Sequence, residues 1–492
     1  MEIQISKKAL KTVSLKWDTL TNYRNYRKNY RIPSTIEELK EANYDNCISL
    51  QVNSRTWILL EEAAQNFNIM LDEIYQPRLH AVVSYQTIYG AIKKQLELEL
   101  GNRETNPKDK RSFNQVLEII QNYLDSSVGN SEYYFVIDGL ELNDFSSINF
   151  GKNEVFLFDE IRRDQLVKSS LSRATQQDEM KLRRTQDFLD DNFLSRVCIK
   201  SVSYGDSETS SKRAYKQAKH IINYFRFIVC LLAHTKISQQ VVRINISSES
   251  YSNSERTVIR RTEDNAIILV SGRGRKSLQN FSVDENLYQQ ILVNGYLKDF
   301  VEIIDAPSQT EIEGRILTAI YWIGEAQNEP DLDVAFIKYW TALESIFTGS
   351  KELIGSQNTG VTKSLAIGVA VLNAFSEYRF VEIENIKSVR STMTELYSKR
   401  SDIIHRGMNY LSYPKIIDTV DVSEVCKYAA WSICSLFSLR SQYTTMSEIN
   451  GQITRLNTQL ERETTLPSTQ KTFRIHERFI RAAKRIYCLI SR

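Results

Sequence analysis

The chain has 492 residues, of which 63 are basic and 60 acidic, giving a formal net charge of +3. This length exceeds a single compact core and indicates two or three domains, while the near balance of charge excludes a globally basic nucleic-acid-binding protein. With only 7 prolines and 17 glycines, the composition favours a helix-rich chain.

The cysteines and the apolar runs indicate the cellular compartment in which the chain is expected. The six cysteines show no CxxC spacing, so neither a zinc site nor a disulfide framework is indicated. The amino-terminal segment lacks the apolar region of a secretion signal, and no run of 18 apolar residues occurs. We therefore expect a cytoplasmic protein with no membrane segment, no metal and no cofactor.

The pattern along the chain predicts an α+β, helix-rich, multidomain fold. Residues 1–127 are predicted to be a helical region, with the clearest helices at 56–75 and 112–124. Residues 128–305 are predicted to form an α+β domain with a sensing or regulatory role. Residues 306–492 are predicted to be a helical bundle that ends in basic helices.

In the α+β domain, two long helices near 174–194 and 211–234 alternate with strand-like runs. These runs lie at 132–140, 153–161, 196–205, 239–246, 256–262 and 265–272. The boundary with the bundle is expected where Asp305, Pro307 and Ser308 interrupt two helical patterns.

The loop SGRGRKS at 271–277 holds three cations beside two glycines, namely Arg273, Arg275 and Lys276. Backbone amides and cations in such a loop suit a phosphate cradle, but many hairpin turns share this composition. An ordinary turn is the favoured interpretation, and the three cations are candidate phosphate contacts.

The segment 331–347 predicts an amphipathic helix in the bundle. Its apolar face carries Phe336, Trp340, Leu343 and Phe347, and Glu344 stands beside that face. Glu344 could reach inward to hold Arg400, or it could be an ordinary surface carboxylate; both interpretations stay open. Trp340 is expected in the core.

A second bundle helix is predicted over 388–405, followed by Gly407 as its stop. Near its end, Arg400 and His405 lie five residues apart. A guanidinium binds phosphate in a planar fork, and an imidazole can move a proton to or from a ribose hydroxyl near neutral pH. Arg213 and His220 have a similar spacing, but His220 lies at the border of a core stripe and is not expected to act.

The helices at 336–347 and 362–375 and the terminal YSKRSDIIHRG at 397–407 occur in the order found in HEPN domains. The chain resembles that superfamily, and within it the Apea-like branch, over about residues 310–440. The resemblance implies an all-helical domain that forms a homodimer. In active members it implies a metal-independent endoribonuclease, often the effector of an anti-phage, abortive-infection or toxin system.

By this resemblance, Arg400 and His405 match the catalytic pair of the family. Many members carry Asn, Asp or His directly after the arginine, whereas this chain has Ser401 there and Asp402 one residue later. Ser401, Asp402 and Glu344 are therefore candidate supporting residues.

Helical geometry gives a separate reason to expect a dimer. Five residues turn a helix by about 500°, so the two side chains point roughly 140° apart. Two helix ends meeting across a two-fold axis would place two arginines and two histidines around one cleft. There, His405 would deprotonate the ribose 2′-hydroxyl while Arg400 holds the phosphate, with Lys399 and Arg406 as further phosphate contacts.

Three functions stay open from the sequence. The first is an RNase whose amino-terminal 300 residues sense a phage-derived or other trigger. The second is a catalytically silent HEPN-like module that binds RNA or nucleotide, and the third is a scaffold. Arg400 and His405 could also simply stabilise the carbonyl end of their helix.

The last helix, 471–492, carries seven basic residues against one acidic. Packing of this helix on the bundle is favoured slightly over RNA binding.

Overall fold

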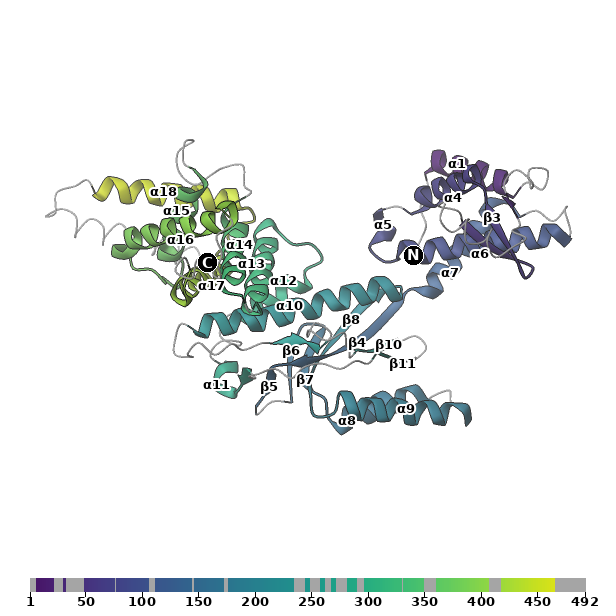
Figure 1. Ribbon diagram of the computed structural model, residues 1–492, viewed down its shortest axis with the longest axis horizontal. Coiled ribbons are helices and arrows are strands. Elements are labelled where there is room, and N and C mark those ends of the chain that lie inside the picture. The colour runs from purple at the N-terminus through teal and green to yellow at the C-terminus, as the bar shows by residue number, and fades with distance from the viewer. Residues whose placement is uncertain are drawn as a thin grey trace.

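The computed structural model shows a helix-rich α+β protein (Figure 1). The structure describes residues 6–21, 30–31, 48–75, 77–105, 111–143, 146–171, 176–233, 244–247, 257–261, 267–270, 281–289, 296–329, 331–348, 360–406 and 417–464. Within these ranges, no helix combines the length and the apolar content that crossing a membrane requires.

Helices and a small sheet make up the N-terminal unit, residues 6–127. Its elements are α1 (Lys7–Leu20), β1 (Tyr30–Arg31), β2 (Ile48–Val52), β3 (Arg55–Leu59), α4 (Glu61–Ile74), α5 (Pro77–His80), α6 (Tyr85–Thr105) and α7 (Phe113–Ser127). The strands form an antiparallel sheet in the order β1-β3-β2. The sequence predicts only helices here, so this sheet is a correction to that expectation.

The hairpin β2–β3 turns through two residues, Asn53 and Ser54, between the paired Val52 and Arg55. Both turn residues have positive φ, 46° and 66°. This is the conformation of a type I′ turn, whose twist matches that of the flanking strands and which accepts Asn readily. The turn residues thus fix the register that buries Leu50 and Trp57.

The sheet unit, residues 129–305, is built on one long strand, β4. Its elements are β4 (Gly129–Asp138), β5 (Leu140–Leu142), β6 (Ser147–Phe150), β7 (Asn153–Leu157), α8 (Glu160–Leu171), α9 (Gln176–Asn192), β8 (Val197–Gly205), α10 (Ser207–Ala233), β9 (Asn245–Ile246), β10 (Thr257–Arg261), β11 (Ile267–Val270), β12 (Phe281–Val283), α11 (Glu285–Leu287) and α12 (Leu297–Asp305). The main sheet has the order β11-β10-β4-β8-β7-β6, with β9 also paired to β4. Its neighbouring strands are antiparallel.

Both faces of this sheet are buried, and alternate residues of β4 serve the two faces. Tyr133 and Phe135 pack in the core with α10, whereas Tyr134 and Val136 pack with residues of α8 and α9. Figure 1 shows α10 along one face of the sheet and α8 with α9 on the other. Burial on both sides explains why β4 reads in the sequence as a continuous apolar run.

The helical unit, residues 311–464, contains six α-helices among its described residues. They are α13 (Glu311–Gln327), α14 (Leu332–Phe347), α15 (Val361–Phe375), α16 (Ile386–Arg406), α17 (Thr419–Leu439) and α18 (Met446–Thr464), with a 3-10 turn, η4 (Ile383–Asn385), before α16. Thr310 and Asp418 start α13 and α17 through capping boxes. The three bundle helices expected over 336–405 are thus present as α14, α15 and α16, whereas the expected stop at Gly407 and the basic helix 471–492 lie outside the described residues.

Helix α10 joins the sheet unit to the helical unit through one continuous hydrophobic core. Its buried Ile221 and Phe225 belong to the same core as Ile199 of β8 and Ile320 of α13. The domain boundary expected at about residue 305 therefore does not separate two cores. The N-terminal unit, in contrast, has a core of its own.

Asp206 connects the N-terminal unit to α10. Its carboxylate accepts the backbone N–H of Thr209 in the first turn of α10 at 2.8 Å, and also the N–H of Ser84, before α6, at 2.8 Å and the hydroxyl of Thr87. Burial raises the pKa of Asp206, but these hydrogen bonds outweigh burial and lower it overall. One carboxylate thus caps α10 and also holds Ser84, whose hydroxyl caps α6 by accepting the N–H of Thr87 at 3.2 Å.

Candidate active site

Arg400 on α16 and Glu344 on α14 are in contact. Arg400 Nη2 lies 3.1 Å from Glu344 Oε1 and 3.4 Å from Oε2. The two side chains are 18% and 23% exposed, so the ion pair is partly shielded from solvent. Two interpretations of Glu344 were open, a carboxylate that holds Arg400 and an ordinary surface carboxylate. The contact agrees with the first of them.

Glu344 is itself oriented from within α14. The indole N–H of Trp340, one turn earlier, donates to Glu344 Oε1 at 3.1 Å. Trp340 is buried in the core as expected, and its ring contacts that of Tyr397 on α16, with centroids 5.8 Å apart. This hydrogen bond was not predicted from the sequence, although the four-residue spacing of Trp340 and Glu344 places both side chains on neighbouring turns of one helix face.

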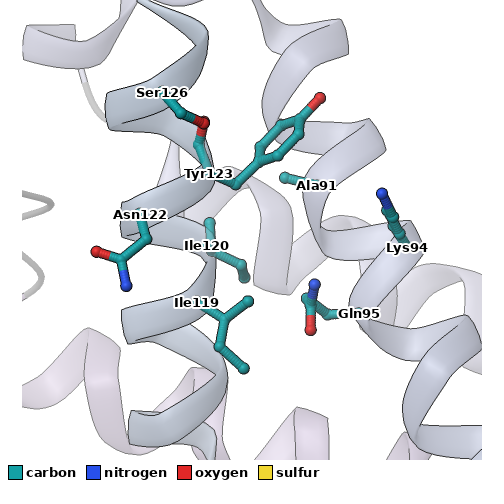
Figure 2. Close-up of a pocket in the computed structure, with 8 residues that line it drawn as sticks. All are labelled: Ala91, Lys94, Gln95, Ile119, Ile120, Asn122, Tyr123 and Ser126. Carbon is teal, nitrogen blue, oxygen red and sulfur yellow. The ribbon is translucent and has the colours of Figure 1, made fainter.

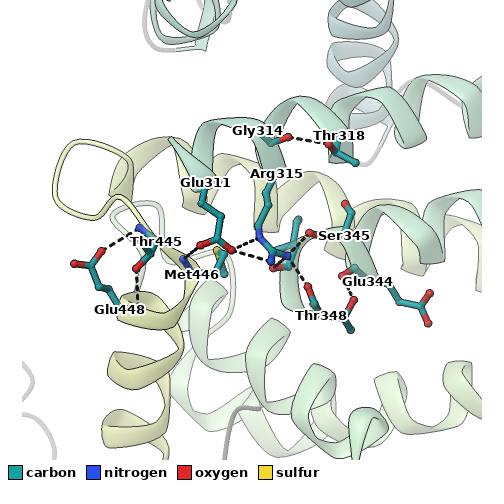
Figure 3. A network of polar contacts seen from close by, with 11 residues as sticks. Glu311, Gly314, Arg315, Thr318, Glu344, Ser345, Thr348, Thr445, Met446 and Glu448 are labelled. Atoms are coloured by element: carbon teal, nitrogen blue, oxygen red, sulfur yellow. Dashed lines mark hydrogen bonds and ion pairs between the residues drawn. The ribbon is translucent and has the colours of Figure 1, made fainter. Parts of the chain in front are cut away.

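The end of α14 that carries Glu344 is held by α13. Arg315 donates to the carbonyl oxygens of Ser345 at 2.8 Å and Thr348 at 2.5 Å, and it pairs with Glu311 at 2.8 Å. Figure 3 shows this network, in which the carboxylate of Glu344 points away from Arg315. Because terminal carbonyls of a helix lack intrahelical partners, these bonds fix the last turn of α14.

Arg400 retains unused hydrogen-bonding capacity. Its guanidinium lies 5.9 Å from the centre of the Tyr397 ring, within the range of a cation–π contact. Its Nε is buried and has no hydrogen-bond partner among the described residues. A buried N–H without an acceptor is unfavourable. The side chain keeps 18% of its surface exposed, and this part of the guanidinium is where an anion can bind.

His405 lies in the last turn of α16 and is exposed to solvent. Of the supporting residues, Ser401 lies in α16 between Arg400 and Asp402 and is partly exposed. Asp402 forms an ion pair with Arg406 at 3.2 Å, one turn along the same helix. Asp402 thus contacts Arg406, a candidate phosphate contact, and its contact with Arg400 or His405 stays a prediction.

Lys399 is engaged in holding the bundle together. Its ammonium lies 2.6 Å from Asp421 in the capping box of α17 and 3.7 Å from Glu395. Burial lowers the pKa of Lys399, but the hydrogen bond and charge of Asp421 outweigh burial and raise it overall. Lys399 and Asp421 are 22 residues apart in the sequence, and no sequence pattern predicts their contact. In this structure the ammonium of Lys399 is paired with α17.

The other candidate cations, Arg273, Arg275 and Lys276, lie outside the described residues. The pair Arg213 and His220 lies on α10, where Arg213 donates to the Tyr204 carbonyl at 3.1 Å and His220 is partly buried. The structure therefore assembles Arg400, Glu344, Trp340 and Tyr397 as one cluster at the α14–α16 contact, with exposed His405 farther along α16. No protein-family model, curated protein or solved structure matches the chain.

Proposed function

We propose that the chain is a HEPN-type, metal-independent endoribonuclease that acts as a homodimer. The observation that carries the proposal is the orientation of Arg400. Its guanidinium is held by Glu344 on one edge, while its buried Nε has no acceptor among the described residues. Because 18% of its side chain stays exposed, Arg400 can bind an anion there, and the exposed His405 on the same helix supplies a proton acceptor.

In the proposed reaction, neutral His405 takes the proton from a ribose 2′-hydroxyl. The 2′-oxygen then attacks the adjacent phosphorus, and the bond from phosphorus to the 5′-oxygen breaks. Arg400 stabilises the negative charge that grows on the phosphoryl oxygens, and a protonated histidine or water returns a proton to the 5′-oxygen. The products are a 2′,3′-cyclic phosphate and a 5′-hydroxyl, and DNA, which lacks the 2′-hydroxyl, is not cut.

The dimer brings two copies of the pair to one substrate. On a single α16, residues five apart point roughly 140° away from each other. An isologous contact between the two α16 ends would place Arg400 of one protomer near His405 of the other. Exposed apolar side chains at the end of α16 and the start of α17, Ile404 at 44% and Val420 at 64%, support a contact on this side.

The cellular role that fits this activity is a cytosolic effector of an anti-phage, abortive-infection or toxin system. In that role, the N-terminal unit and the sheet unit respond to a trigger and control the helical unit. This assignment rests on the HEPN resemblance and on the order of the units along the chain.

The test compares purified full-length wild type with His405→Ala and Arg400→Ala in excess chelator, using total RNA and single-stranded DNA. We expect wild type to leave cyclic-phosphate ends on RNA and to spare DNA. His405→Ala should lower the cleavage rate by about 10²-fold or more, since general base catalysis contributes that much. His80→Ala, at an exposed histidine of the N-terminal unit, is the matched control and should cut like wild type.

Equal cleavage by wild type and His405→Ala would exclude the role of His405. A second function is favoured by the same ion pair, because a partly buried Arg400 and Glu344 also suit a bundle that only binds RNA or nucleotide, or that serves as a scaffold. Intact RNA in every sample, with RNA binding lost in Arg400→Ala, would assign the binding module.

A further inference from the structure

The N-terminal unit is joined to the sheet unit by a very short chain connection. Helix α7 ends at Ser127 and β4 begins at Gly129, so Val128 is the only residue between them. Its backbone is extended, with φ −109° and ψ 132°. The two units bury their apolar residues in separate cores, and Val128 belongs to the core of the N-terminal unit. Rotation of the backbone next to Val128 therefore moves one unit against the other while both cores are kept.

A second connection between the units is polar and converges on Asp206. We call it the latch, and it consists of residues 82–87, which lead into α6, and residues 205–209, which lead into α10. The carboxylate of Asp206 accepts the N–H of Ser84 at 2.8 Å and the hydroxyl of Thr87. The latch thus links segments that are more than 100 residues apart in the sequence.

The backbones of the two latch segments also lie against each other. The N–H of Asp206 donates to the carbonyl oxygen of Val82 at 2.9 Å. A Cβ at Gly205 would lie 3.0 Å from the same oxygen, and the φ of Gly205 is 151°, which other residues rarely adopt. Glycine at this position therefore permits the close approach of the two segments.

The two carboxylate oxygens of Asp206 have different partners. Oδ1 accepts the N–H of Thr209 in the first turn of α10 at 2.8 Å, whereas Oδ2 accepts the two donors of the N-terminal unit. Loss of the Oδ2 contacts therefore leaves α10 capped. Because a few hydrogen bonds add much less net free energy than the burial of a core, the latch can open while both units stay folded.

The packing between α6 and α7 is incomplete next to this junction. A pocket of about 370 Å³ lies between the two helices (Figure 2). Ala91, four residues after Thr87, lines it from α6, and Ser126, two residues before Val128, lines it from α7. A closely packed contact transmits displacements rigidly, so this pocket leaves α6, which begins at the latch, room to shift against α7.

We propose that the N-terminal unit is hinged, with Val128 as the pivot and Asp206 as the residue that holds the unit closed against α10. In the open state the contacts of Ser84 and Thr87 with Asp206 are broken, while Asp206 still caps α10. Since α10 shares its core with the helical unit, the closed latch fixes the N-terminal unit relative to the rest of the molecule. This hinge is independent of RNA cleavage.

Asp206→Asn in the full-length protein tests the latch selectively. Its one amide oxygen can still cap α10, but its amino group cannot accept the donors of Ser84 and Thr87. In hydrogen exchange read by mass spectrometry, the Ser84 amide should exchange about tenfold faster than in wild type, roughly the effect of one lost hydrogen bond to a charged group. Amides of α4 and β8 should keep their wild-type rates, and small-angle X-ray scattering should give a larger radius of gyration.

Two further variants complete the test. Thr87→Val removes a donor from the other side of the latch and should shift both readouts in the same direction. Asp418→Asn is the matched control, because Asp418 caps α17 within the helical unit, and it should change neither readout.

Three outcomes would overturn the proposal. An unchanged exchange rate at Ser84 would show that Asp206 does not hold the unit closed. Faster exchange throughout α4 or β8 would show that the contacts support folding instead. Faster exchange at Ser84 with an unchanged radius of gyration would show that the N-terminal unit does not move about Val128.

Discussion

At the residue scale, the candidate site depends on a chain of contacts from Trp340 through Glu344 to Arg400. The indole fixes one carboxylate oxygen, and the carboxylate fixes one edge of the guanidinium. Each partner removes rotamer freedom from the next, which orients Arg400 before any ligand arrives. The proposed contact of Arg400 with a phosphate requires a guanidinium that is held in place in this way.

The ion pair should also contribute to stability. Glu344→Ala leaves the partly buried charge of Arg400 without its partner, and we expect a loss of about 2 kcal/mol in the free energy of unfolding, less than for a fully buried pair. Urea denaturation followed by circular dichroism measures this loss. The control is Arg406→Ala, which removes an exposed pair with Asp402 and should cost less than about 0.5 kcal/mol. Equal losses in the two variants would contradict the shielding of the Arg400 pair.

His220 should make stability depend on pH in a defined window. Burial and the nearby charge of Lys216 lower the pKa of His220 from its ordinary 6.5 to about 4. Between these values the unfolded chain binds a proton that the folded chain does not, so the contribution of His220 to stability falls as the pH is lowered. The loss at pH 4 is at most about 3 kcal/mol.

The measurement is urea denaturation of wild type and His220→Gln at several pH values from 7 to 4, because glutamine does not titrate. The stability of wild type relative to His220→Gln should fall as the pH drops through the window. His80→Gln, at an exposed position, is the control and should follow wild type. A constant difference between wild type and His220→Gln across the range would contradict the shift.

At the scale of elements, apolar periodicity located most of the helices and the strands of the main sheet. The predicted runs 132–140, 153–161 and 196–205 correspond to β4, β7 and β8, because each is buried and rich in β-branched and aromatic residues. The strand β3 was missed because residues 55–59 run without interruption into α4. Leu60, at the start of α4, makes no side-chain capping bond, so the sequence carries no signal that a helix begins there.

The candidate site was predictable in part, for a related reason. The contacts of Trp340 with Glu344 lie within one helix, where spacing reveals neighbours. The contacts of Lys399 with Asp421 and of Arg400 with Glu344 depend on how helices pack and which side chain reaches which partner. Spacing alone does not determine those choices.

For the molecule as a whole, the contact of α10 with α13 unites the sheet unit and the helical unit. Gly324 of α13 lies directly against Asn223 of α10. A Cβ at Gly324 would lie 2.2 Å from Asn223 Oδ1 and 2.8 Å from its Cβ. Asn223 cannot move away easily, since it is fully buried and accepts a hydrogen bond from Arg226 at 2.8 Å.

Gly324→Ala should therefore force α10 and α13 apart and lower the free energy of unfolding by about 1–3 kcal/mol, the usual cost of overpacking. Gly314→Ala in the same helix is the matched control. Its added Cβ meets nothing within 4 Å, so it should stabilise the protein by up to about 1 kcal/mol through helix propensity. Urea denaturation compares the two, and a stable Gly324→Ala variant would show that the helices adjust their separation freely.

The position of α10 also bears on how such a chain can evolve. The apolar residues of α10 pack against both the sheet and the bundle. A recombination that keeps α10 with only one of these two partners would therefore disrupt the core. A genetic exchange near residue 305 would leave Ile221 and Phe225 facing a bundle for which they were not selected, whereas an exchange near residue 128 would leave this core whole. We expect the sheet unit and the helical unit to diverge together, whereas a replacement of the N-terminal unit has to preserve the contacts of Asp206 with Ser84 and Thr87.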